Sequence, residues 1–122
     1  MKSPFAEKSY AFAVQIVSTC DSIAESKREF ILTKQLVRSG TAISALYQES
    51  RHAESRADFI HKLAIALKEC NESIYWINLL FDTGKMSPEK HTALLEDATQ
   101  LLKMLTAMII TSKKNAQKKP PL

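Results

Sequence analysis

Apolar residues recur three and four positions apart along most of the chain, a spacing that places them on one face of a helix. The first stripe follows Ser3-Pro4, a helix N-cap with proline at the first helical position, and fades near residues 25–27. A second stripe runs from about Arg28 to His52, and Gly40 in its middle indicates a close helix contact or a local weakness. The apolar residues of the two stripes are Phe12, Ala13, Ile16, Val17, Cys20 and Ile23, then Leu32, Leu36, Ile43, Leu46 and Tyr47.

The third stripe is the most regular, because its spacings of three and four alternate without interruption. This heptad-like seam predicts packing against other helices at shallow angles. Trp76 widens the seam near its end, and we expect the seam and Trp76 to lie in the core or in an oligomer interface. The seam consists of Ile60, Leu63, Leu67, Cys70, Ile74, Ile77 and Phe81.

Two breaks divide the chain beyond residue 28 into helices. One helix from residue 28 to residue 83 would be roughly 84 Å long, so we place a break between His52 and Phe59, with Ser55-x-x-Asp58 as the next cap. Gly84 supplies a left-handed C-cap, and Ser87-Pro88 opens a fourth helix. The pattern predicts an all-α, up-down-up-down four-helix bundle over residues 1–112. The seam of the fourth helix consists of Leu94, Ala98, Leu101, Leu105 and Met108.

Charge is concentrated at the C-terminal end of the sequence. The chain of 122 residues has 17 Lys and Arg against 13 Asp and Glu, and four of the lysines fall in residues 113–122, which hold no acid. The remainder is therefore formally neutral, and we expect residues 113–122 to form a disordered, Lys-rich tail. Two glycines and four prolines are too few turn-formers for a many-stranded sandwich or barrel.

The sequence favours a cytoplasmic protein. Cys20 and Cys70 are too few for a disulfide framework, and the start lacks the apolar region of a signal peptide. No apolar run approaches the roughly 18 residues that a membrane span needs. We expect no membrane association, no cofactor and no small-molecule substrate.

Motifs for catalysis are absent from the sequence, which contains no phosphate loop, zinc-protease signature, Cys-x-x-Cys pair or nucleophile elbow. Glu49-x-x-His52 and Asp58-x-x-His61 resemble the paired motifs of four-helix di-iron proteins, but they flank a turn instead of facing each other at mid-helix. We therefore interpret these histidines as surface or helix-end residues. Cys20 and Cys70 fall on apolar stripes, which indicates buried thiols. The sequence favours a protein that is not an enzyme.

Basic and aromatic residues give the candidates for nucleic-acid binding. Lys34 and Arg38 lie one helical turn apart and could contact phosphate, although such pairs often join acids instead. Tyr75 and Trp76 could stack a base, although aromatic residues beside a heptad seam are usually core or interface. The remaining candidates are the tail lysines Lys113, Lys114, Lys118 and Lys119.

The second and third helices, QLVRSGTAISALYQES and ADFIHKLAIALKECNESIYWINLL, resemble a known family. They are similar to bacterial four-helix-bundle proteins encoded in intervening sequences of 23S ribosomal RNA genes, a superfamily that includes the accessory variability proteins of diversity-generating retroelements. The resemblance runs over residues 5–112. It is most specific at Arg38-Ser39-Gly40-Thr41, Ile43, Glu49, Asp58-Phe59-Ile60, Ala66-Leu67-Lys68-Glu69 and Tyr75-Trp76.

The resemblance implies a four-helix bundle that assembles as a ring-shaped homopentamer. The retroelement relatives are associated with nucleic-acid binding through a basic surface and with a reverse transcriptase partner. Where such proteins often have a small residue and Asn followed by a basic residue, this sequence has Ala45-Leu46 and then Tyr47-Gln48, which removes a polar group and a positive charge.

Two functional hypotheses follow. The first is a module associated with RNA, or with a nucleic-acid-processing protein, whose phosphate contacts are the tail lysines and Lys34 and Arg38. The second is a protein–protein interaction scaffold with no nucleic-acid binding, which the neutral body favours.

Overall fold

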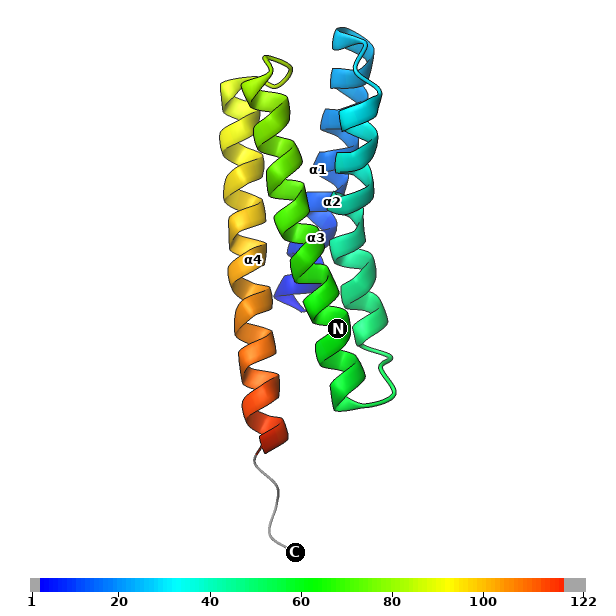
Figure 1. Ribbon diagram of the computed structural model, residues 1–122, viewed down its shortest axis with the longest axis vertical. Helices are drawn as coiled ribbons and strands as arrows, with labels where there is room; N and C mark the ends of the chain where they lie inside the picture. The colour runs from blue at the N-terminus through cyan, green and yellow to red at the C-terminus, as the bar shows by residue number, and fades with distance from the viewer. Residues whose placement is uncertain (1–2, 118–122) are drawn as a thin grey trace, which may run out of the picture.

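The computed structural model describes residues 3–117, and it confirms the all-α class and the four-helix bundle (Figure 1). The helices span Pro4–Lys27 (α1), Ile31–Ser50 (α2), Arg56–Asp82 (α3) and Pro88–Gln117 (α4). Each runs antiparallel to the one before it in the chain (Figure 1). Packing is extensive between α1 and α2, α2 and α3, and α3 and α4, and much sparser between α1 and α4.

Serine side chains begin three of the helices, as the sequence predicts. The hydroxyl oxygens of Ser3 and Ser55 accept the backbone N–H groups of Ala6 and Asp58, each at 3.0 Å. Ser87 accepts the N–H of Lys90 at 3.2 Å. These bonds satisfy donors that the first turn of a helix leaves unpaired, so the starts of α1, α3 and α4 are fixed by local sequence.

The second helix is shorter than the predicted range from Arg28 to His52. Arg28 adopts a left-handed conformation with φ of 53°, which ends α1. Glu29 then caps α2 from outside, because its carboxylate accepts the N–H of Leu32 at 2.6 Å. The loop that follows α2 covers residues 51–55, where the break was predicted.

Gly84 ends α3 in the predicted left-handed conformation, with φ of 76°. The N–H of Lys85 reaches back to the carbonyl oxygen of Leu80 at 2.8 Å, and the N–H of Gly84 reaches that of Phe81 at 3.0 Å. This pair of bonds satisfies carbonyl groups at the end of the helix.

The core is drawn from all four helices. The close contact at Gly40 is confirmed: a Cβ atom added there would lie 2.9 Å from Cγ2 of Ile16, so the missing side chain lets α1 and α2 approach. The largest fully buried side chains of the core are Phe12, Ile16, Leu36, Ile43, Leu63, Ile77, Leu80, Leu94, Leu101 and Leu105, together with both cysteines.

The buried face of α3 differs from the seam read from the sequence. Leu63, Cys70 and Ile77 are fully buried, whereas Ile60 and the other large seam residues are only partly buried. The small residues Ala66 and Ser73 take core positions instead, because α3 packs against two neighbours and its buried face is rotated from the apolar seam.

The last helix extends further than predicted. The tail was expected to begin at residue 113, but α4 continues to Gln117, so Lys113 and Lys114 lie on its final turns. Lys118 and Lys119 lie outside the described residues. In the described part of the chain, no helix is long and apolar enough to cross a membrane.

Candidate nucleic-acid interface

The α2–α3 loop and the end of α4 lie at the same end of the bundle (Figure 1). Exposed basic residues occur in both segments. Nη1 of Arg56, the first residue of α3, donates to the carbonyl oxygen of Ser112 at 3.3 Å. This bond holds the start of α3 against the part of α4 that leads into Lys113 and Lys114, which are exposed on its last turns. Arg51, exposed in the loop, adds a fourth positive charge at this end.

Acidic residues at this basic end are fewer than the basic residues, and some of them already form hydrogen bonds or ion pairs. Asp58 accepts the N–H of Glu54 at 3.3 Å, and Glu49 pairs with Lys62 at 3.3 Å. Glu54 is exposed in the loop. Glu7 lines a pocket together with Arg51, so three acids outside the ion pairs, Glu7, Glu54 and Asp58, stand against these four cations. Positive charge exceeds negative charge by one, without the lysines beyond residue 117.

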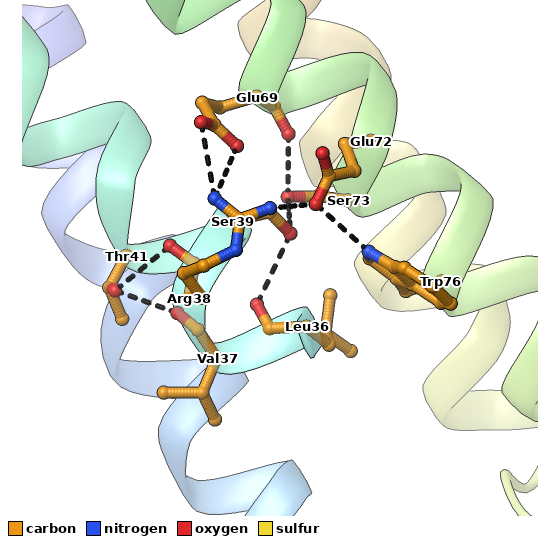
Figure 2. A network of polar contacts seen from close by, with 9 residues as sticks. All are labelled: Leu36, Val37, Arg38, Ser39, Thr41, Glu69, Glu72, Ser73 and Trp76. Atoms are coloured by element: carbon orange, nitrogen blue, oxygen red, sulfur yellow. Dashed lines mark hydrogen bonds and ion pairs between the residues drawn. The ribbon is translucent and has the colours of Figure 1, made fainter. Parts of the chain in front are cut away.

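The other predicted phosphate contacts, Lys34 and Arg38, both lie exposed on α2, but Arg38 is engaged by α3 (Figure 2). Its Nη1 donates to both carboxylate oxygens of Glu69, at 3.1 and 3.2 Å, and its Nη2 pairs with Glu72. Two carboxylates thus compensate one guanidinium, which disfavours a phosphate contact at Arg38.

Trp76 belongs to the same network (Figure 2). Its indole N–H donates to Glu72 at 3.1 Å, and the ring is partly buried. Tyr75 is 57% exposed and meets Trp76 edge-on, with ring centroids 4.9 Å apart. Only Tyr75 of this pair presents an open ring face for stacking, and Trp76 serves the helix packing.

Beneath these charges, a hydrogen bond links the two helices through the core. The hydroxyl of Ser73 lies 2.9 Å from that of Ser39, and both serines are fully buried (Figure 2). Each hydroxyl also contacts a carbonyl oxygen of its own helix. Both buried hydroxyl groups therefore have hydrogen-bond partners, and the bond between them fixes the register of α2 against α3.

The predicted core or interface residues of α3 divide into two groups. Leu63 and Ile77 have no exposed surface and belong to the core. The partly buried members, whose edges remain available to another surface, are Ile60, Leu67, Ile74, Trp76 and Phe81.

A larger exposed apolar surface lies on α1, where the apolar periodicity did not predict one. Tyr10, Val14 and Val17 are 66%, 50% and 40% exposed and line a groove of about 760 Å³ between α1 and α2. Gln48, at the position where the family resemblance implies a basic residue, lines the same groove. Leu46, in contrast, packs against the core. The spacing of three and four residues assigns Val17 to the predicted apolar stripe, but it does not reveal that α1 has a second apolar side.

The sulfhydryl groups are not poised for nucleophilic attack. Burial raises the pKa of the Cys20 thiol to about 12, with Asp21 adding to the shift, and burial raises the pKa of Cys70 to about 12. Both therefore remain protonated at neutral pH. Within residues 3–117, no group of three or more His, Cys, Asp or Glu side chains is arranged to hold a metal ion.

The sequence matches one family over nearly its whole length. Residues 2–107 fit the family described as 23S rRNA-intervening sequence protein. The chain belongs to this family. The match ends before Lys113, so the C-terminal lysines lie outside the part of the chain that matches the 23S rRNA-intervening sequence proteins.

A solved structure supports the same assignment. It is the crystal structure of a protein of unknown function from the S23 ribosomal protein family of Bacteroides thetaiotaomicron. It has 43% sequence identity and a TM-score of 0.85, and the alignment covers 86% of this chain and 97% of that one. A comparison with curated proteins gives no match.

The residues that carry the family resemblance lie mainly where α2 meets α3. Arg38, Ser39 and Gly40 each hold α2 against a neighbouring helix, and Glu69 and Trp76 complete the network on α3. In this chain, packing and ion pairing inside the bundle therefore account for these residues.

Proposed function

We propose that this protein is a non-catalytic four-helix bundle that assembles with copies of itself and contacts RNA through the basic end. The observation that carries the RNA contact is the bond from Arg56 to Ser112, because it brings Arg56 to the end of α4 that also carries Lys113 and Lys114. Clustered cations bind phosphates by releasing condensed counterions, without needing a particular base sequence. In an oligomer each subunit would add the same cluster, so the number of phosphate contacts would rise with the number of subunits.

The test is the salt dependence of RNA binding. A labelled, structured RNA is titrated with the full chain and with a variant in which Lys113, Lys114, Lys118 and Lys119 are changed to Gln. Glutamine keeps the helix propensity of lysine, so α4 should remain intact. We expect a steep salt dependence for the native chain, with a slope lower in the variant by roughly 0.7–0.9 for each phosphate that the variant no longer neutralises.

A matched control removes four positive charges elsewhere, at the exposed or half-buried residues Lys8, Lys34, Lys68 and Lys103. If the control loses as much affinity as the C-terminal variant, binding reflects net charge and the basic end is not the contact. The proposal also fails if neither native chain nor control binds the RNA at low salt.

For self-association, the supporting observation is the groove between α1 and α2. Its exposed apolar residues are of the kind that oligomer interfaces bury. We propose that a second copy covers this groove and that the assembly is the homopentamer implied by the family resemblance. Subunit number is measured by light scattering after size-exclusion chromatography. Val14→Glu should yield monomers, and Ala93→Glu, at an exposed position on α4, should not.

A protein–protein scaffold is the second candidate function. It is favoured by the engagement of Arg38 with Glu69 and Glu72, which leaves the motif region without a surplus of positive charge. Oligomer formation combined with no RNA binding at low salt would select this function over the first.

A further inference from the structure

A polar cleft lies between α1 and the start of α4. The end of α1 and the α3–α4 turn, which form it, lie at the end of the bundle opposite the α2–α3 loop (Figure 1). The cleft has a volume of about 380 Å³ and lies along the sparsely packed α1–α4 contact. Its walls come from residues 18–27 of α1 and from residues 85–90 around the α3–α4 turn. This volume is within the usual range for pockets that hold small ligands.

Three lysines line this cleft: Lys27 at the end of α1, Lys85 in the turn and Lys90 in the first turn of α4. The ion pairs formed within the described part of the chain involve none of the three. The acids of the same segments, Asp21, Glu25 and Glu89, are exposed and do not line the cleft. The lining thus carries positive charge without a compensating carboxylate.

Hydroxyl groups supply the remaining polar surface. Ser18, Ser22, Ser26 and Ser87 line the cleft beside the lysines. Ser87 accepts the N–H of Lys90 at 3.2 Å, which leaves its hydroxyl hydrogen available to donate. The end of α1 carries the negative end of its helix dipole and the start of α4 carries the positive end of its own. These two contributions offset each other in the cleft, so the lysines determine the sign of the electrostatic potential there.

Thr19 gives an independent indication that this cleft takes a polar ligand. Its side chain lines the cleft, is only 6% exposed, and has an Oγ1 atom without a hydrogen-bond partner in residues 3–117. A buried hydroxyl without a partner is costly, and native proteins usually satisfy such groups with protein, water or ligand. Rotation about its Cβ–Oγ1 bond lets the hydroxyl hydrogen of a threonine turn toward a bound acceptor.

We propose that this cleft binds a phosphate monoester, held by Lys27, Lys85 and Lys90 and by hydroxyl donors that include Thr19. Three ammonium groups match a dianion, and hydroxyl donors can satisfy its remaining oxygen atoms. The ligand could be a small phosphorylated metabolite or the phosphorylated end of an RNA, and both present the same chemical group. The site does not depend on the basic end, because about 23 residues of α4 separate Lys90 from Lys113, or roughly 35 Å.

The experiment uses the full chain labelled with ¹⁵N and titrated with inorganic phosphate at constant ionic strength. We expect saturable shifts of amide resonances in residues 18–27 and 85–90. The double variant Lys85→Gln, Lys90→Gln should bind at least about tenfold more weakly, because two charged donors are removed. The control, Lys68→Gln with Lys103→Gln, removes the same charge from positions outside the cleft and should bind like the native chain.

Two further arms separate the sources of phosphate and the role of the orphan hydroxyl. RNA oligonucleotides of one sequence, with a 5′-phosphate or a 5′-hydroxyl, show whether an RNA end enters the cleft, and adenosine monophosphate represents small esters. Thr19→Val should weaken phosphate binding while preserving the fold, because valine has nearly the same shape.

Non-saturable shifts, shifts elsewhere, or equal losses in the lysine variant and its control would overturn the proposal. The variant with glutamine at Lys113, Lys114, Lys118 and Lys119 should retain the phosphate site, so failure of the RNA proposal would leave this one standing.

Discussion

Gly40→Ala tests the closest helix contact in the bundle. The new Cβ atom would lie 2.9 Å from Cγ2 and 3.0 Å from Cγ1 of Ile16. Ile16 is fully buried and β-branched at the contact, so it cannot turn away without leaving its rotamer. Relief therefore requires α1 and α2 to separate, and overpacking of this kind costs about 1–3 kcal/mol.

The same substitution has an opposing local effect. Alanine is favoured over glycine inside a helix by about 1 kcal/mol. Subtracting this gain from the packing cost leaves an expected net loss of about 1 kcal/mol in the free energy of unfolding. The measurement is urea denaturation followed by far-UV circular dichroism, at one fixed protein concentration because an oligomer's stability depends on concentration.

A double-mutant cycle isolates the contact from the propensity effect. Ile16→Ala removes the atoms that clash and alone should cost about 2–5 kcal/mol. In that background the Cβ atom of residue 16 would still lie 3.3 Å from the new Cβ atom, but the two nearer atoms are gone, so Gly40→Ala should no longer destabilise the chain. The reasoning would be refuted if Gly40→Ala stabilised the native chain by the full propensity gain.

Three further predictions concern the cysteines, the orphan threonine and the ion-pair network. Cys20 and Cys70 should resist thiol reagents until the chain unfolds. Because folding raises their pKa values from 9.0 to about 12, the free energy of unfolding should be unaffected below pH 9 and should fall between pH 9 and 12, where the thiols of the unfolded chain ionise first. Each loss should disappear in the matching Cys→Ala variant. Thr19→Val should raise the free energy of unfolding by about 1 kcal/mol in phosphate-free buffer, since an unsatisfied buried hydroxyl is removed, and a loss in urea denaturation would contradict this. Arg38→Gln should lower the free energy of unfolding by about 1–2 kcal/mol, because it leaves the mostly buried Glu69 unpaired. Arg38→Lys should recover only part of that loss. Lys62→Gln, at the exposed pair with Glu49, should cost less than about 0.5 kcal/mol.

Local signals explain why the ends of the helices could be predicted from the sequence. Ser3, Ser55 and Ser87 cap their helices through atoms three residues away, and Gly84 needs only its own backbone conformation. The start of α2 was misplaced because Arg28 adopts a left-handed conformation that is rare for a residue with a side chain.

Contacts between helices limited what the sequence could show of the core and the site. Ala66 and Ser73 are too small or polar to stand out in an apolar pattern, yet they occupy the face where α3 meets its neighbours. Arg38 finds its acids 31 and 34 residues away, and Arg56 meets Ser112 across 56 residues. Spacing within one helix contains no information about such pairs.

The order of packing has a consequence for how the chain folds. Nearly all helix contacts join consecutive helices, so most of the core forms between segments that a short loop already holds together. Chains dominated by such local contacts fold fast, on a microsecond-to-millisecond scale, because little loop entropy is spent before the helices meet. The α1–α4 contact joins the two ends of the chain and is the sparsest, so it should close last during folding and open first in native-state hydrogen exchange.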